Sequence, residues 1–421
     1  MVNDYLLRIE KYDSGLDGLN SIREINPNVI KEESKAIEEG GFMQGLAIVV
    51  KDNINVKGLH TTAGSLALSD NVAKEDAEVI ANLKSSGAVI LGKANMTEFA
   101  NYMTNHMPGG YSSIGGQVIC AYNRDENPWG SSTGSAVAVS SCMCDAGVGT
   151  DSCGSIVLAA MRNGVCGYRP PVGELSQRGI IPISFTMDTA GPIAKNVMDL
   201  IAVYNGMKGK NNIVLEDTEL VGKKIAVNQW DVDNMSEEDK EHIKNVVKRM
   251  KIAGAVVENI DLEVNFNVRN IMLYEFRHGL DNYLHTAHSK IRSIEDIIMF
   301  NEQHPDETLL YGQDKLLFAL QQTSGNMDET IYIEAMKDRQ NVIATVSEKL
   351  KQYDACYMCM PMNNISQYAG LPSLSLTDGL GKNGMPLGIF LSGTDENMLL
   401  NIAYAMEKTV CKGYIKPNLL C

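Results

Sequence analysis

Short apolar runs alternate along the chain with longer stretches of helical periodicity. From Gly45, the run LAIVV is followed by the helical stretch EDAEVIANLKSSG and then by the run AVILG. The same order returns between Lys223 and Asp261, where KKIAVNQ precedes SEEDKEHIKNVVKRMKIAG and AVVENID. A short apolar run bounded by glycine is typical of a buried strand, and strands that alternate with helices predict an α/β fold.

The two ends of the chain extend this pattern. The first forty residues predict two short helices, and residues 264–350 predict a mostly helical region in which Gly and Pro are sparse. After it, DACYMCMP, PSLSLTD and PLGIFLSG predict strands, and a helix follows from Glu396. Because strands of one style come from both ends, we expect a single mixed sheet rather than separate domains.

One segment departs from this rhythm. Between Asn127 and Gly191 the chain is dense in Gly, Ser, Thr, Ala and Cys. Small residues let backbone segments approach closely and leave N–H groups pointing into a cavity, which suits an anion-stabilising turn. Tight helix packing is the alternative. Within this segment, GTDSCGSIV places Ser155 in a glycine-flanked turn without a histidine nearby.

Charge and cysteine usage narrow the classes of partner. The formal net charge is −15 and no basic cluster stands out, which argues against nucleic acid and favours a small neutral substrate. Nine cysteines without paired spacing, and a start that lacks the features of a signal peptide, predict reduced thiols in a cytoplasmic protein. No apolar run reaches the roughly 18 residues that would span a bilayer, so we expect no membrane contact.

A nucleophile elbow is the first catalytic arrangement to weigh. Residues 130–134 spell G-x-S-x-G, but the elbow needs an apolar strand directly before it, and AYNRDENPW is polar. It also needs a late histidine, and none follows His304. The pattern therefore gives this interpretation little support.

A metal site is the second arrangement to weigh. His285 with His288, and Cys356 with Cys359, are the close ligand-type pairs. Neither has a second pair at a spacing that would close a tetrahedral site. We interpret both pairs as packing residues and expect no metal.

A lysine offers a base in place of the absent histidine. Lys51 directly follows the strand-like run LAIVV, so its side chain starts at the end of a buried element. Desolvation lowers the pKa of a lysine from about 10.4 toward a range where the neutral amine can accept a proton. A serine–lysine pair is an established alternative to serine–histidine, although a solvated surface charge is the commoner fate of a lysine.

Four stretches then follow in order: GLAIVVKDN, GSSTGSA, GTDSCGSI and GIIPISFTMDTAGPIAKNVMDL. Together they resemble the amidase signature family, from about Leu19 to the C-terminal helix and most strongly between Gly45 and Leu200. ANMTEFANYM, YSSIGGQV and DTAGP are most similar to the peptide-amidase-like branch of bacterial amidases. The resemblance implies a single large α/β domain whose central mixed β-sheet is covered by helices on both faces.

The resemblance also implies a catalytic set. It makes Lys51 the base, Ser131 a relay preceded by a cis peptide bond, and Ser155 the nucleophile. The implied oxyanion hole and supporting residues are the N–H groups of Ser152, Cys153, Gly154 and Ser155, with Ser132 and Asp151 in support.

The implied reaction is hydrolysis of a linear carboxamide, from a small molecule or a peptide, through an acyl-enzyme with release of ammonia or an amine. It needs no cofactor. Two alternatives stay open. One is the transamidating A subunit of a glutamine-dependent aminoacyl-tRNA amidotransferase. The other is a catalytically impaired member of the family with a binding or structural role. We leave a homodimer open as well.

Within one amidase domain over residues 1–421, the resemblance implies four parts. They are an N-terminal helical segment (1–40), a signature core (45–225), a helical substrate region (264–350) and C-terminal strands with a helix that complete the sheet (351–421).

Two departures from the family pattern stand out. Cys153 occupies a position where the family usually has Gly or Asp, and we expect a buried inert thiol there, with sensitivity to oxidation as the alternative. Arg169-Pro170-Pro171 replaces the usual Lys-Pro-Thr and is expected to alter the loop.

Overall fold

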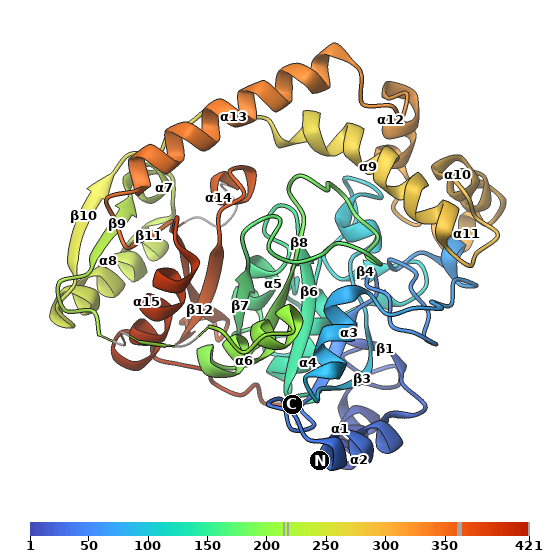
Figure 1. Cartoon of the computed structure of the whole chain (residues 1–421), viewed down its shortest axis with the longest axis horizontal. Helices are drawn as coiled ribbons and strands as arrows, with labels where there is room; N and C mark the ends of the chain where they lie inside the picture. Colours follow the sequence, from blue (N-terminus) through green and yellow to red (C-terminus); the bar gives the residue numbers. More distant parts are fainter. Residues whose placement is uncertain (214, 217–218, 360–363, 420–421) are drawn as a thin grey trace.

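One mixed β-sheet runs through the centre of the computed structural model, which describes residues 1–213, 215–216, 219–359 and 364–419 (Figure 1). Its eleven described strands lie in the order β1-β3-β2-β6-β8-β7-β12-β13-β11-β9-β10, and β4 pairs with β5 in a small separate ribbon. The strands are β1 (Ile22–Ile25), β2 (Ala47–Lys51), β3 (Val89–Ala94), β4 (Tyr111–Ser112), β5 (Gly116–Gln117), β6 (Ala146–Asp151), β7 (Cys166–Arg169), β8 (Thr189–Ala194), β9 (Lys224–Asn228), β10 (Val256–Ile260), β11 (Ala355–Tyr357), β12 (Ser373–Leu380) and β13 (Pro386–Ser392).

The helices cover the sheet and form a separate layer at one edge. In Figure 1, α9 and α13 cross the top of the view, away from the helices that pack on the sheet. The helices are α1 (Val2–Tyr12), α2 (Val29–Glu39), α3 (Glu78–Ser85), α4 (Thr133–Ser140), α5 (Val157–Arg162), α6 (Val197–Lys208), α7 (Gln229–Asp233), α8 (Glu237–Ile252), α9 (Val268–Thr286), α10 (Ile294–Gln303), α11 (Pro305–Thr308), α12 (Asp314–Gln322), α13 (Thr330–Leu350), α14 (Ile365–Tyr368) and α15 (Glu396–Thr409).

Alternating side chains of β2 build two cores, one on each face of the sheet. Ile48 and Val50 belong to an apolar cluster with residues of α3, α6, α8 and α15, whereas Ala47 and Val49 join a second cluster with α1, α2, α4 and α5. Successive side chains of a strand point to opposite faces, so a continuous apolar run is what a strand buried on both faces requires.

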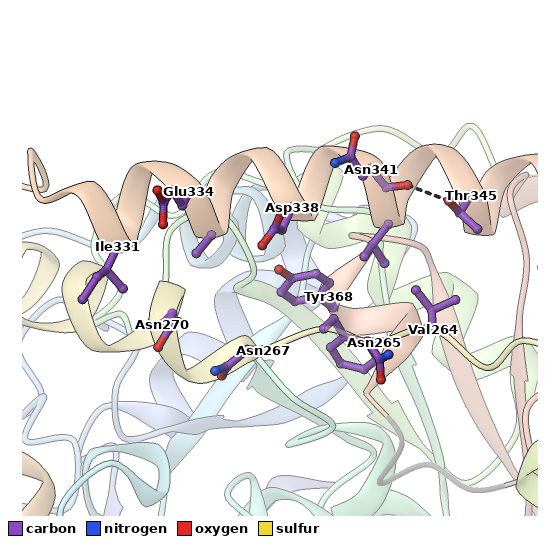
Figure 2. Close-up of a pocket in the computed structure, with 13 residues that line it drawn as sticks. Val264, Asn265, Asn267, Asn270, Ile331, Glu334, Asp338, Asn341, Thr345 and Tyr368 are labelled. Carbon is purple, nitrogen blue, oxygen red and sulfur yellow. Dashed lines mark hydrogen bonds between the residues drawn. The ribbon is translucent and has the colours of Figure 1, made fainter.

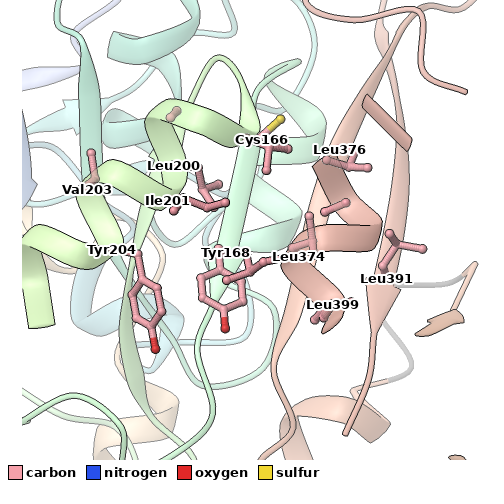
Figure 3. Packing of buried hydrophobic residues seen from close by; sticks show 14 of the residues in the cluster. Cys166, Tyr168, Leu200, Ile201, Val203, Tyr204, Leu374, Leu376, Leu391 and Leu399 are labelled. Atoms are coloured by element: carbon pink, nitrogen blue, oxygen red, sulfur yellow. The ribbon is translucent and has the colours of Figure 1, made fainter. Parts of the chain in front are cut away.

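A tyrosine pair shows how α6 packs on the sheet (Figure 3). The rings of Tyr168 on β7 and Tyr204 on α6 meet edge to face with centroids 5.0 Å apart. Both hydroxyls donate to the carboxylate of Glu396 at the start of α15, at 3.0 Å and 2.7 Å. The pair thereby satisfies its buried polar atoms within an otherwise apolar core.

The strand register brings distant segments to one edge of the sheet. β2 lies parallel to β6, and β6 lies antiparallel to β8 with Asp151 opposite Thr189. β7 is also antiparallel to β8, so it runs in the direction of β6 and ends at Arg169. The edge of the sheet formed by the carboxyl ends of β2, β6 and β7 and the start of β8 therefore carries Lys51, Asp151, Arg169 and Thr189.

The predicted fold class is confirmed, because a single domain holds a large mixed sheet flanked by helices. β1 was missed: it lies between the two predicted N-terminal helices, and its sequence IREI has neither a continuous apolar run nor a clean alternation. It pairs antiparallel with β3 at the sheet edge. Met360 and Pro361, the end of one predicted strand, lie outside the described residues, and the four-part division of the chain stays a prediction.

Within the described part of the chain, no helix combines the length and the apolar character needed to cross a membrane.

Gly134 on α4 tests how closely this helix packs. A Cβ atom at Gly134 would lie within 3.0 Å of the backbone of Ser21 and Asn95, and backbone cannot move aside as a side chain can. We expect Gly134→Ala to lower the free energy of unfolding by about 2–4 kcal/mol in a denaturant titration. Gly393→Ala is the matched control, because its nearest neighbour, the Asp354 carbonyl oxygen, lies 3.6 Å away. Equal stability of the two variants would contradict this packing.

Candidate functional site

Lys51 is the last residue of β2, and its side chain is fully buried. Its Nζ lies 2.8 Å from Ser131 Oγ, 2.9 Å from Thr150 Oγ1 and 3.1 Å from the Thr150 carbonyl oxygen. A neutral amine has two N–H groups and one lone pair. The two N–H groups can donate to Thr150, which leaves the lone pair facing the Ser131 hydroxyl.

Burial shifts the proton equilibrium of this lysine. Desolvation lowers the pKa of Lys51 to about 7, and the negative charges of Asp151 and Asp188 oppose the shift. Near neutral pH, Lys51 is therefore the uncharged amine in a large share of the molecules. This is the state in which it can accept a proton.

A second buried lysine on the neighbouring strand shows what is particular to Lys51. Burial lowers the pKa of Lys93 as well, to about 8. Its Nζ, however, donates to the carbonyl oxygens of Ile54 and His60 and lies 3.5 Å from Asp52 Oδ1. Lys93 also donates to Thr61 Oγ1 at 3.1 Å, so a hydroxyl neighbour is common to both lysines, and the nearby carboxylate distinguishes Lys93.

Ser131 lies just before α4, and the peptide bond that joins it to Gly130 is cis. The side chain is fully buried, and the Ser131 carbonyl accepts a hydrogen bond from the Thr97 N–H at 3.2 Å. All eight residues of α4 are buried, and they are small or β-branched: Thr, Gly, Ser, Ala and Val. The small-residue segment therefore serves close packing, and the same packing brings Ser131 to Lys51.

The turn of residues 152–156, which contains the predicted nucleophile Ser155, connects β6 to α5 and is shaped by one carboxylate. Asp151 accepts the N–H groups of Gly154 and Ile156 at 2.7 Å each and that of Val157 at 3.3 Å. The Nε atom of the fully buried Arg169 lies 3.3 Å from Asp151 Oδ1 and offsets its charge. Charge-assisted bonds of this kind fix the path of a short turn.

Ser132 links the segment that contains Ser131 to the residues on either side of Asp151. Its N–H donates to the Ser155 carbonyl at 3.1 Å, and its hydroxyl donates to the Thr150 carbonyl at 3.1 Å. Ser155 itself is half-buried. Among the described residues no hydrogen bond joins the Ser131 and Ser155 hydroxyls, so proton transfer between them stays a prediction.

The predicted oxyanion hole divides into two kinds of N–H group. The Gly154 N–H already donates to Asp151, so an incoming oxygen would have to share it. Gly154 has φ +101°, and this conformation turns the chain between Cys153 and Ser155. The other N–H groups of the predicted hole are those of Ser152, Cys153 and Ser155. These three N–H groups remain the better candidates for an oxyanion.

The cysteine in this turn is half-buried rather than fully buried as expected, and its thiol packs against α9. Cys153 Sγ lies 3.5 Å from Met272 Sδ on α9, and burial raises the pKa of the Cys153 thiol. A protonated thiol is a poor nucleophile and oxidises slowly. This environment fits the expectation of an inert thiol rather than an oxidation-sensitive one.

Three residues at the site had no predicted role. Thr150 holds Lys51, Arg169 pairs with Asp151, and Asp188 lies where its charge acts on Lys51. Burial raises the pKa of Asp188 to about 6. The motifs GTDS, RPP and MDTAGP contain these residues, but only the folded sheet edge shows that the three meet.

The structure gives members of both predicted packing pairs ordinary protein contacts. Cys356 is buried in an apolar cluster, and His285 Nδ1 bonds the Asp281 carbonyl of its own helix. No group of three or more His, Cys, Asp or Glu side chains suited to a metal occurs in the ranges that the structure describes.

A groove of about 650 Å³ lies between α13 and the segment that leads into α9 (Figure 2). It contains none of Lys51, Ser131 and Ser155, so it is separate from the candidate catalytic residues. Its lining residues are Val264, Asn265, Phe266, Asn267, Asn270, Ile331, Glu334, Ala335, Asp338, Asn341, Val342, Thr345 and Tyr368.

Comparison with known proteins identifies the family. The amidase family model matches residues 1–366, and the chain belongs to this family, as the motifs predict. The structure is similar to that of an amidase family protein from Bacillus anthracis strain Ames, with a TM-score of 0.91, 32% identity, and coverage of 99% of this chain and 88% of that one.

Two further relatives bear on function. The peptide amidase of Stenotrophomonas maltophilia has a TM-score of 0.86 and 31% identity, with 100% of this chain and 95% of that chain covered. The A component of the glutamyl-tRNA(Gln) amidotransferase of Saccharolobus solfataricus is 27% identical, over 97% of this chain and 92% of its own length. As a member of the amidase family, the chain is an amide-hydrolysing enzyme.

The pKa of Lys51 predicts how serine reactivity depends on pH. The rate of covalent modification by a fluorophosphonate, measured in the full chain, should rise through pH about 7 and reach a plateau above it, because the neutral amine is the active form. Lys51→Ala should remove this limb and most of the rate. A wild-type profile that is flat between about pH 6 and 9 would contradict the role of Lys51 as base.

Proposed function

We propose that this chain hydrolyses a linear carboxamide with Lys51 as base, Ser131 as proton relay and Ser155 as nucleophile. The observation that carries the proposal is the fully buried Lys51 with its Nζ 2.8 Å from Ser131 Oγ. A buried amine with a lowered pKa, in contact with a hydroxyl, is the arrangement that a serine nucleophile needs when no histidine is near.

Acylation requires two linked proton transfers, from Ser155 to Ser131 and from Ser131 to Lys51. Neutral Lys51 accepts the proton of the Ser131 hydroxyl while Ser131 accepts that of Ser155, whose Oγ forms a bond to the amide carbonyl carbon. The negative charge that develops on the carbonyl oxygen is stabilised by the N–H groups of Ser152, Cys153 and Ser155, with Gly154 sharing its own.

Breakdown returns the proton by the same path. The Lys51 ammonium donates to Ser131, which donates to the leaving nitrogen as the carbon–nitrogen bond breaks, and ammonia or an amine departs. Water then attacks the Ser155 ester and releases the acid with the serine regenerated. These steps use protein groups, the amide and water, so the proposal includes no cofactor.

Hydrolysis is favoured over transamidation by the comparisons. The peptide amidase supports hydrolysis through its TM-score of 0.86 and 31% identity over 100% of this chain. The net charge of −15 gives no support to tRNA contact. A catalytically impaired member would have no need of a contact between Lys51 and Ser131, and the chain keeps it.

The acyl group and the leaving amine belong to the same proposal. We assign their selection to the helical region 264–350, because α9 from this region contacts the nucleophile turn through Met272 and Cys153. A small-molecule or peptidyl amide, a cytoplasmic location and a homodimer remain predictions.

The triad is tested by comparing two serine variants. Ser155→Ala should abolish ammonia release from the best substrate found in a screen of simple, aromatic, peptidyl and fatty amides, because no nucleophile remains. Ser132→Ala removes a hydroxyl that bonds the Thr150 carbonyl and N–H but keeps Ser155, so it should reduce the rate by about tenfold to a hundredfold. Thermal unfolding of both variants serves as the control for folding.

Mass spectrometry of the fluorophosphonate adduct identifies the nucleophile independently of the substrate. The adduct should lie on Ser155. An adduct on Ser132 would revive the elbow interpretation of residues 130–134, and full ammonia release by Ser155→Ala would exclude the proposed mechanism.

A further inference from the structure

Glu275 is a fully buried carboxylate on α9 that lies outside the proposed triad. One of its oxygens accepts from the Ser184 hydroxyl at 2.5 Å and the Thr186 N–H at 3.1 Å. The other accepts from the Thr186 hydroxyl at 2.8 Å and from the Tyr332 hydroxyl on α13 at 2.8 Å. A charge removed from water is tolerated only with several donors of this kind, and here two of the donor residues belong to one short segment.

That segment, residues 183–188, ends at the site. Asp188 Oδ2 accepts the N–H groups of Ile183 and Ser184 at 2.7 Å and 3.0 Å. The Asp188 carboxylate is buried beside the side chain of Ser152 in the nucleophile turn, and this contact lowers the Asp188 pKa against the effect of burial. The segment therefore folds back on its own aspartate and presents one carboxylate oxygen toward the catalytic turn.

The segment is also held by two arginines. Arg339 on α13 donates to the Thr186 carbonyl at 3.0 Å, and Arg169 donates to the Met187 carbonyl at 2.6 Å. Bonds from α9, α13 and β7 thus converge on residues 184–187. The segment is thus one connection between the helical region and the sheet edge that carries Lys51, beside the contact of Met272 with Cys153.

The charged groups around this connection are few. Lys51 faces Asp151 and Asp188, and Asp188 in turn faces Glu275 and Arg169. Glu275 faces Arg339 and the Tyr332 hydroxyl. Among these charged groups, Asp188 interacts electrostatically with both Glu275 and Lys51.

We infer that Glu275 is a positioning residue for acylation: through Ser184 and Thr186 it fixes the segment that places Asp188 beside Ser152 and Lys51. This inference rests on the proposed function. In the acylation transition state Lys51 gains a proton, and a fixed carboxylate stabilises the ammonium that forms. In a buried site such an effect depends steeply on position.

The test is a double-mutant cycle read by the rate of fluorophosphonate modification of Ser155. It uses the full chain at about pH 8.5, where Lys51 is neutral and Asp188 is ionised. We expect Glu275→Gln to lower the rate about tenfold and Asp188→Asn to lower it at least as much. In the Asp188→Asn background, Glu275→Gln should cause no further loss.

Ser184→Ala separates position from charge. It keeps the Glu275 carboxylate and the Ser184 N–H but removes one bond to the segment, so it should lower the rate in the same direction and also lose its effect in the Asp188→Asn background. It is also the milder change if Glu275→Gln fails to fold. Glu237→Gln on α8, which is exposed and pairs with Lys240, is the matched control and should leave the rate unchanged.

The pH dependence of the modification rate distinguishes positioning from a purely structural role, because a structural role of Glu275 would leave the acid limb in place. Asp188 favours the charged form of Lys51, so its displacement should lower the Lys51 pKa and move the acid limb of the rate to lower pH in Glu275→Gln. Losses that add in the Asp188→Asn background, or an unshifted acid limb, would overturn the inference. A wild-type chain that is not modified at Ser155 would overturn the proposed function and this inference together.

Discussion

The site depends on keeping one lysine out of water at the end of a central strand. β2 lies between β3 and β6 with both faces covered, and the Lys51 side chain is fully buried. The desolvation that results lowers its pKa to about 7, and the contacts with Ser131 and Thr150 direct its lone pair. The small residues of α4 are a condition for this, because a bulkier helix would hold Ser131 away from the sheet.

Two carboxylates limit how far burial lowers the pKa of Lys51. Asp151 shapes the turn that contains Ser155 through three N–H groups, and Arg169 offsets its charge. Asp188 adds a second negative charge from a segment that the helical region holds in place. The basicity of Lys51 is thus a balance between desolvation, which favours the free amine, and these charges, which favour the ammonium. A lysine with either influence alone would be a weaker base or a permanently charged one.

Local sequence predicted the parts of this arrangement that are contiguous. The run LAIVV became β2 with Lys51 at its end, the helix after it became α3, and the ordered motifs indicated Lys51, Ser131 and Ser155. The contacts of Arg169, Asp188 and Glu275 could not be predicted in this way, because their partners lie on other elements and are joined only by strand register and helix packing. The bond from Gly154 to Asp151 likewise depends on the turn's geometry rather than on its composition.

The most direct test is the proton equilibrium of Lys51 itself. Titration of the folded chain with ¹⁵N-labelled lysine side chains, followed by NMR, reports each amine separately. Loss of one signal in Lys51→Ala assigns it, and Lys93→Met separates the other depressed lysine. We expect a midpoint at about 7 for Lys51. A midpoint near the ordinary value of about 10.4 would contradict it, because the side chain would then be a charged group at neutral pH and no base for Ser131.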